Sequence, residues 1–174
     1  MPPPLPLEPS GKYRICLVCL GNICRSPMAE VVVRSELDRA GLSGQVTVDS
    51  AGTGDWHLGE PMDARARAEL SRRGYDGSAH RARQIDSSWL DGYDLVIAMD
   101  CSNLRNLQRM AAGRPELTSR IRLLRSFDPA AGPAAEVPAP YDGGEGEFAH
   151  VFGLVLASAR GLAGQLGAQL LPGG

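Results

Sequence analysis

The sequence predicts an α/β protein with three layers (αβα), in which helices cover both faces of a four-stranded parallel sheet. Strand-like apolar runs alternate with helix-like stretches along the 174 residues, and this alternation is typical of βαβ units with right-handed crossovers. A tight loop containing glycine and asparagine follows the first strand, at the end of the sheet where parallel strands bind ligands. The length fits one domain with a full core.

The elements follow in chain order from local patterns. The proline-rich stretch 1–10 is expected to be a flexible tail, and 11–174 a single domain. Apolar runs predict strands at 13–18, 45–49, 94–99 and 121–126. Helical stretches are predicted at 27–40, 61–73, 87–90, 102–112 and 147–170, the last of them amphipathic. The Pro-, Ala- and Gly-rich stretch 128–146 has no periodicity and predicts one mobile loop.

The loop after the first strand is the most informative part of the sequence. In segment 19–25 a cysteine stands where the strand ends, and an arginine stands where the next helix begins. Loop amides and a helix N-terminus favour an oxyanion, and Gly21 and Asn22 tolerate left-handed backbone. Arg25 can bind two phosphate oxygens through its planar fork. The same positive surroundings favour the thiolate of Cys19, so the pattern predicts a nucleophile beneath a bound phosphate.

With Ser26 behind the arginine, this loop resembles the signature of the low-molecular-weight protein tyrosine phosphatases of bacterial type. Further segments that resemble this family are 49–53, 56–59, 61–63, 80–84, 94–100 and 103–104. The resemblance runs from about Lys12 to the last helix. It implies hydrolysis of phosphotyrosine proteins or peptides through a phosphocysteine on Cys19, with Arg25 binding the phosphate in the transition state.

The resemblance also implies the residues that surround the phosphate. The loop that holds it comprises Leu20, Gly21, Asn22, Ile23 and Cys24. Ser26 would stabilise the departing thiolate.

Other residues would hold the loop in shape or act under oxidation. Asn22, Ser50 and His80 resemble the family's supporting residues, although Ser50 and His80 could equally be caps or turn formers. Cys24 resembles the second loop cysteine that pairs reversibly with Cys19, or else it only packs. Arg83 and Asp100 are expected to form a structural ion pair.

Specificity is partly readable from the same comparison. Trp56 and Tyr141 are expected to flank the mouth of the loop and sandwich an aromatic ring. His57 is a further expected substrate-binding residue, and Asp142 is expected to reduce the aromatic wall and add negative charge near the mouth. Relatives that act on phosphoarginine resemble this loop but carry Thr at the position of Ile23, so this residue favours an aryl ester. A core position for Trp56 is the alternative, which its loop-like, polar neighbours disfavour.

Position 139 departs from the family pattern. The family has an Asp-Pro-Tyr motif whose Asp is the general acid, whereas this chain reads Ala139-Pro140-Tyr141. A positioned acid contributes about 10²–10⁴-fold, so turnover should be impaired while binding is retained. Ala139 is either an engineered exchange or natural to the chain. Asp142 or Asp128 could substitute as the acid, although both are expected to be poorly placed.

Composition excludes several classes of function. The net charge of -2 gives no reason to expect nucleic-acid or membrane binding, and the dispersed histidines predict no metal site and no cofactor. The four cysteines do not form a disulfide framework. We therefore expect the reducing cytoplasm as the compartment, with export without a signal peptide as an alternative. We expect a monomer, because no large exposed apolar stripe is evident in the sequence.

Two other functions stay open. A pseudophosphatase would bind phosphotyrosine proteins without turnover, which the missing acid would explain. An arsenate reductase shares this fold and loop but needs two further relay cysteines, and only Cys101 is available.

Overall fold

The computed structural model describes residues 2–8, 11–140 and 143–171. Across these residues the strands form one parallel sheet in the order β2-β1-β3-β4, with β1 (Tyr13–Cys19), β2 (Val46–Gly52), β3 (Leu95–Ala98) and β4 (Ile121–Leu123). The helices are α1 (Arg25–Arg39), α2 (Ala64–Arg72), α3 (Cys101–Met110), α4 (Pro115–Thr118) and α5 (Glu145–Leu170), with 3₁₀ turns η1 (Ser87–Gly92) and η2 (Leu124–Phe127). The predicted fold class is confirmed.

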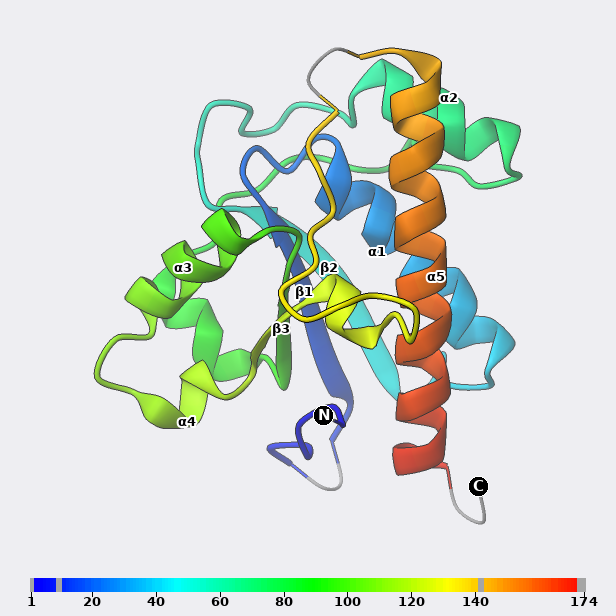
Figure 1. Cartoon of the computed structure of the whole chain (residues 1–174). Helices are drawn as coiled ribbons and strands as arrows, with labels where there is room; N and C mark the ends of the chain where they lie inside the picture. Colours follow the sequence, from blue (N-terminus) through cyan, green and yellow to red (C-terminus); the bar gives the residue numbers. More distant parts are fainter. Residues whose placement is uncertain (1, 9–10, 141–142, 172–174) are drawn as a thin grey trace.

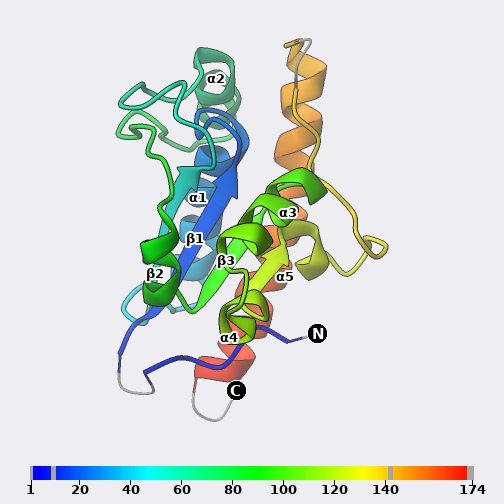
Figure 2. The same ribbon diagram turned by 90° about the vertical axis from the view of Figure 1, so that its left-hand side faces the viewer.

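Two hydrophobic clusters cover the two faces of the sheet. Because successive side chains of a strand point to opposite faces, Ile15 and Leu17 of β1 pack with α1 and α5, whereas Cys16 and Val18 pack with α3, α4 and η1. The two helical layers lie on opposite sides of the sheet in Figure 1, and α3 and α4 face the viewer in Figure 2. Burial on both faces explains why the strands read as continuous apolar runs.

The strand order places a topological switch point at β1. The chain passes from β1 to β2 on one side and later to β3 on the other side of β1. Crevices at the carboxyl ends of strands next to such a point are the usual ligand sites of open α/β sheets. Residues 20–24, which join β1 to α1, lie at this end (Figure 1).

Helix α5 packs along the face of the sheet as a core helix. By length and composition it could cross a membrane, yet 44% of its most apolar window is buried inside the protein. Phe148, Val155 and Leu162 join the same hydrophobic cluster as α1. Its apolar residues are therefore explained by packing in the core, as the predicted amphipathic pattern requires.

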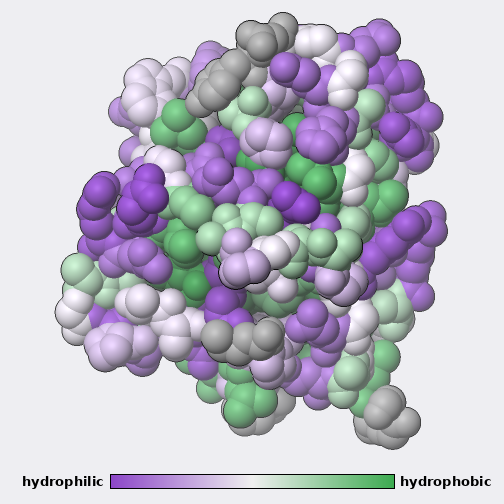
Figure 3. Space-filling view, in the orientation of Figure 1, coloured by the Kyte–Doolittle hydropathy of each residue, from purple (hydrophilic) through white to green (hydrophobic). Residues whose placement is uncertain are grey.

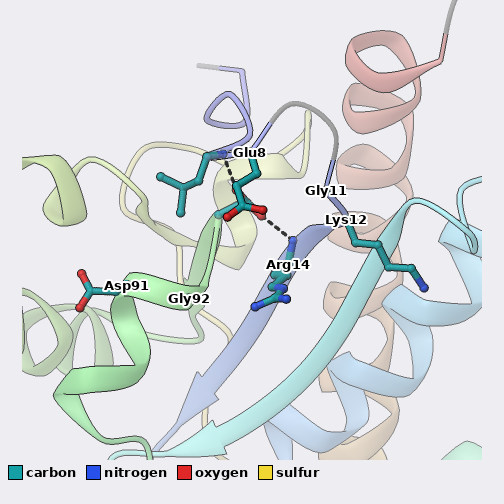
Figure 4. A pocket seen from close by; sticks show the side chains of 8 residues that line it. Glu8, Gly11, Lys12, Arg14, Asp91 and Gly92 are labelled. Atoms are coloured by element: carbon teal, nitrogen blue, oxygen red, sulfur yellow. Dashed lines mark hydrogen bonds between the residues drawn. The ribbon is translucent and has the colours of Figure 1, made fainter.

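The N-terminal stretch is attached to the domain. Residues 2–8 contain no helix or strand, but the Asp94 carboxylate accepts the N–H groups of Leu7 at 2.6 Å and Arg14 at 2.7 Å (Figure 4). The Tyr13 hydroxyl donates to the Pro4 carbonyl at 2.8 Å. The expectation of a free tail is therefore wrong for 2–8, and the other residues of 1–10 lie outside the described residues. This attachment lies at the opposite end of β1 from Cys19.

Three local expectations differ from the structure. Residues 124–126 were expected in the last strand, but β4 ends at Leu123 and η2 follows. Helix α4 was not predicted, although proline at a first helical position is a known start signal. The stretch 128–146 is anchored in part, because Val137 is buried and its N–H donates to the Met99 carbonyl at 2.8 Å.

Candidate active site

A cavity of about 280 Å³ opens at the carboxyl end of β1. Its walls come from the loop between β1 and α1, the loop after β2, the start of α2 and the segment before α5. The lining residues are Cys19, Leu20, Gly21, Ile23, Cys24, Arg25, Trp56, His57, Asp63, Arg65, Ala139 and Pro140. Most of the residues that the sequence assigns to the site therefore share one cavity.

Cys19 forms the base of this cavity as the last residue of β1. It is 3% exposed, and its Sγ lies 2.9 Å from the Ser26 Oγ. The Asn22 N–H also donates to this sulfur, at 3.3 Å. A backbone donor and a hydroxyl group therefore lie within hydrogen-bond distance of the sulfur.

The loop above the sulfur offers backbone donors to the cavity. Within the described residues, no hydrogen bond uses the N–H groups of Gly21, Ile23, Cys24 or Arg25. Helix α1 begins at Arg25 without a side-chain cap, so the positive end of its dipole also faces this loop. Such a set of donors suits an oxyanion.

Asn22, rather than Gly21, adopts the left-handed conformation that this loop needs. Its φ is 58°, whereas Gly21 is not among the residues of positive φ. Asparagine tolerates this region better than most non-glycine residues. Of the two residues in this loop that tolerate left-handed backbone, Asn22 is the one that adopts it.

The buried Asn22 side chain joins the loop to two other segments. Its Nδ2 donates to the Ser26 Oγ at 2.8 Å and to the Ser50 Oγ at 3.0 Å, and its Oδ1 accepts the Arg83 N–H at 2.9 Å. Because the Ser26 oxygen accepts from Asn22, its own hydroxyl proton is free to point to the Cys19 sulfur. The Cys19 sulfur at 2.9 Å is the nearer acceptor for that proton, since the Ala51 carbonyl oxygen lies 3.5 Å away.

Ser50 and His80 complete this support. The Ser50 hydroxyl donates to the Glu30 carboxylate at 2.6 Å, which Arg34 holds from the next turn of α1 at 2.7 Å. The His80 Nε2 lies 2.6 Å from the Asn22 carbonyl oxygen. Both residues thus lie where the sequence predicts supporting residues for the loop.

Arg25 turns its guanidinium into the site and not to solvent. Its side chain is 6% exposed, and its Nη1 donates to the Asp100 carboxylate at 2.6 Å and to the Val137 carbonyl at 3.0 Å. Within the described residues its Nε and Nη2 donate to no acceptor. Those two nitrogens form one edge of the fork, which can bind two oxygens of a phosphate.

The predicted pair of Arg83 and Asp100 is wrong. Asp100 binds Arg25, whereas the Arg83 guanidinium lies 3.4 Å from the Asp49 carboxylate. Asp100 follows β3 just as Cys19 follows β1, and these two strands are neighbours in the sheet. Their carboxyl ends therefore bring Asp100 beside Arg25.

Gly52 allows the loop to lie against the end of β2. A Cβ at this position would lie 2.7 Å from the Leu20 carbonyl oxygen and 3.1 Å from the Asn22 nitrogen. Such distances cannot be relieved by moving a side chain, because both atoms belong to the backbone. Glycine in the segment 49–53 therefore has a steric reason here.

The mouth of the cavity is partly apolar. Trp56 is 68% exposed and lines the cavity, so the core alternative for this residue is wrong. Leu20, in the loop between β1 and α1, and Leu58, in the loop after β2, are also exposed. Tyr141 and Asp142 lie outside the described residues.

Asp63 and Arg65 line the cavity but were not predicted for the site. The Asp63 carboxylate caps α2 by accepting the Arg65 N–H at 2.8 Å, and the Asp63 N–H donates to the Ile23 carbonyl at 2.8 Å. The hydrogen bond from the Arg65 side chain lowers the pKa of Asp63. In the sequence, Asp63 reads only as the cap of a helix. Nothing in that local pattern indicates that the start of α2 lies against the loop between β1 and α1.

Cys24 differs chemically from Cys19. Burial, and then the nearby Asp63 and Cys19, raise the pKa of the Cys24 thiol to about 12. Cys24 is therefore a neutral thiol at neutral pH, and its position in the cavity is compatible with either alternative, redox partner or packing residue.

Ala139 lines the cavity where the family resemblance places a general acid. Asp128 does not line the cavity; its carboxylate accepts the Ala130 N–H at 2.9 Å and lies 3.8 Å from the Arg125 guanidinium. Asp128 is therefore poorly placed for proton transfer, as expected.

Comparisons with known proteins agree with this geometry. The model of the low molecular weight phosphotyrosine protein phosphatase family matches residues 14–171. A low molecular weight protein-tyrosine-phosphatase of Streptomyces coelicolor is 50% identical over 151 residues, which cover 86% of this chain and 91% of that protein.

Solved structures give the same result. A protein tyrosine phosphatase of Entamoeba histolytica, with Hepes in its active site, is 32% identical with a TM-score of 0.85 and covers 92% of this chain and 100% of its own. Vibrio vulnificus Wzb in complex with benzylphosphonate is 29% identical with a TM-score of 0.75 and covers 88% and 99%.

The fold and the family match together indicate a protein tyrosine phosphatase. The chain belongs to the low molecular weight phosphotyrosine protein phosphatase family.

Proposed function

We propose that this protein hydrolyses phosphotyrosine in proteins or peptides through a phosphocysteine on Cys19, with turnover impaired by Ala139. The observation that carries the proposal is the position of the Cys19 sulfur at the base of a cavity that Arg25 also lines. This sulfur lies 2.9 Å from the Ser26 hydroxyl oxygen. A thiolate there attacks phosphorus as the bond to the tyrosine oxygen breaks. Water then displaces the sulfur and releases phosphate.

Each residue has a role that follows from its contacts. The free edge of Arg25 and the loop amides stabilise the equatorial oxygens in both steps, which is the dominant contribution in phosphoryl transfer. Ser26 donates to the sulfur and lowers the cost of its departure in the second step. Asn22 keeps the Ser26 hydroxyl oriented.

The mouth supports an aryl ester as the substrate. The exposed Trp56 at the rim offers an aromatic face to a phenyl ring. The related Wzb forms a complex with benzylphosphonate, in which a methylene group replaces the ester oxygen of an aryl phosphate. Ile23 lines the same cavity with an apolar side chain.

Ala139 supplies no proton to the tyrosine oxygen. Phenolate with a pKa of about 10 is a poor leaving group at neutral pH, and a positioned acid contributes about 10²–10⁴-fold. We expect Ala139→Asp to raise kcat for a phosphotyrosine peptide by about a hundredfold, and Cys19→Ser to abolish turnover.

A matched control is Ala134→Asp, which adds the same charge to an exposed position of the same segment. Released phosphate is the measurement. Unchanged turnover in Ala139→Asp would show that position 139 is not the acid site, and residual turnover in Cys19→Ser would exclude the phosphocysteine.

A phosphotyrosine-binding pseudophosphatase is the second candidate, and Ala139 is the observation that favours it. Calorimetry with a phosphotyrosine peptide, run beside a phosphate-release assay, separates the two functions. Tight binding without release over hours would favour the pseudophosphatase.

We further propose a monomer that acts in the reducing cytoplasm. The four cysteines are free, which suits a reducing compartment. On the face shown in Figure 3, hydrophobic residues are interspersed among hydrophilic ones, and large obligate interfaces are usually more apolar.

A further inference from the structure

An imidazole and a carboxylate meet at the rim of the cavity. His57 lines the cavity together with Cys19 and Ala139, and its Nδ1 lies 2.8 Å from the Glu60 Oε2. The other edge of the ring lies against the loop: a Cβ on Gly21 would be 3.0 Å from the His57 Cδ2 and 3.7 Å from its Nε2.

The carboxylate fixes the protonation of the ring. An ionised Glu60 only accepts hydrogen bonds, so the Nδ1 of His57 carries a proton. The Nε2 on the side of the loop is then the position that gains or loses a proton. Within the described residues no hydrogen bond uses this Nε2, and the side chain is 38% exposed.

The other titratable groups that line the described cavity are poor proton donors at neutral pH. Hydrogen bonds from Arg65 lower the pKa of Asp63 and keep it ionised, and burial raises the pKa of Cys24 to about 12. Arg25 and Arg65 stay charged. Histidine is the residue that ordinarily exchanges a proton near neutrality.

We propose that His57, oriented by Glu60, is the proton donor and acceptor in place of the acid missing at position 139. This inference rests on the proposed phosphatase function. In the first step the Nε2 proton passes to the tyrosine oxygen as the P–O bond breaks and the S–P bond forms. In the second step Nε2 takes a proton from water as the water oxygen bonds phosphorus and the Cys19 thiolate leaves, which restores the imidazolium.

The proposal predicts a particular dependence on pH and on the leaving group. The first step needs a proton on the Nε2 of His57, so kcat/KM for a phosphotyrosine peptide falls at alkaline pH, where this nitrogen has no proton to give. The charged and titratable groups that face this site come from three segments. They are Glu60 beside His57, then Cys19, Cys24 and Arg25 at the connection between β1 and α1, and Asp63 and Arg65 at the start of α2. A substrate such as p-nitrophenyl phosphate, whose leaving group needs no proton, depends less on the imidazolium.

The test compares His57→Asn with His150→Asn. His150 lies on the other side of residues 138–140 and lines a separate cavity with Glu147 and Val151. We expect His57→Asn to lower kcat/KM for a phosphotyrosine peptide by about tenfold to a hundredfold, within the range of general acids, and to remove the alkaline fall. The loss for p-nitrophenyl phosphate should be much smaller, and His150→Asn should resemble the parent protein.

A second arm uses Ala139→Asp as the background. With a carboxylic acid restored, His57→Asn should cost less than about threefold, because only one donor is needed.

Equal losses for both substrates, or an alkaline fall that survives His57→Asn, would overturn the proton-transfer role and leave His57 as a binding residue. Failure of the proposed phosphatase function has a different signature, since neither the parent protein nor Ala139→Asp would then release phosphate from a phosphotyrosine peptide, whatever residue stands at position 57.

Discussion

Asn22 makes a hydrogen bond with each of its backbone and side-chain polar groups. Its N–H donates to the Cys19 sulfur, its carbonyl faces His80, and its side chain contacts Ser26, Ser50 and the Arg83 N–H. The residue is fully buried. Its amide therefore couples the nucleophile to β2 and to the segment before η1.

Replacing Asn22 tests this coupling. We expect Asn22→Ala to lower the free energy of unfolding by about 2–4 kcal/mol, because three buried polar groups lose a partner and the left-handed φ becomes strained. Phosphate binding should weaken in parallel. Urea denaturation and phosphate inhibition measure the two effects.

Asn22→Gly is the matched variant, because it removes the same side chain but suits a φ of 58°. It should be less destabilising than Asn22→Ala by about 1 kcal/mol. Equal losses would show that the backbone at this position is not strained.

At the level of elements, α5 depends on a close approach to η2. A Cβ on Gly161 would lie against the Phe127 carbonyl oxygen, whereas a Cβ on Gly164, one turn later, would have nothing within 4 Å. The glycine at 161 thus lets the helix reach the core, and the glycine at 164 has no such role.

These two positions give opposite predictions for one substitution. Gly161→Ala should destabilise the protein by about 2 kcal/mol or more, because backbone must shift. Gly164→Ala should stabilise it by about 0.5–1 kcal/mol, because alanine is the better helix former. Thermal unfolding of both variants measures the difference, and losses of the same size in both would contradict the packing of α5 on η2.

Across the whole molecule, what the sequence predicts depends on how local the interaction is. The cradle from Cys19 to Ser26 was predictable because its residues are contiguous and their types suit a strand–loop–helix turn. Two partners of the cradle, Ser50 and Asp100, come from other elements.

Some of these distant contacts left a usable signal. Asp100 follows β3 at the edge of the sheet that also carries Cys19, so the parallel topology alone brings the two together. The attachment of residues 2–8 to Asp94 left none, because backbone N–H groups of any sequence can donate to a buried carboxylate.

The packed molecule also predicts how stability depends on alkaline pH. Burial is the main cause that raises the pKa values of the Cys16 and Cys24 thiols and of the Tyr13 and Tyr93 hydroxyls. For Cys24 the pKa rises from 9.0 to about 12. The native state thus holds these protons at pH values where the unfolded chain has lost them.

The sign follows from this difference in proton binding. Their contribution is complete below about pH 9, where both states are protonated, and it is lost as pH rises because the unfolded state is then favoured. Between its pKa in the unfolded chain and its higher pKa in the native state, each such group lowers the free energy of unfolding by about 1.4 kcal/mol per pH unit. Urea denaturation under reducing conditions between pH 7 and about 10.5 should show a plateau and then a steep fall. Cys16→Ala should be less stable at pH 7 but have a shallower fall, since one buried thiol is removed; a plateau that continues to pH 10.5 would contradict the burial of these groups.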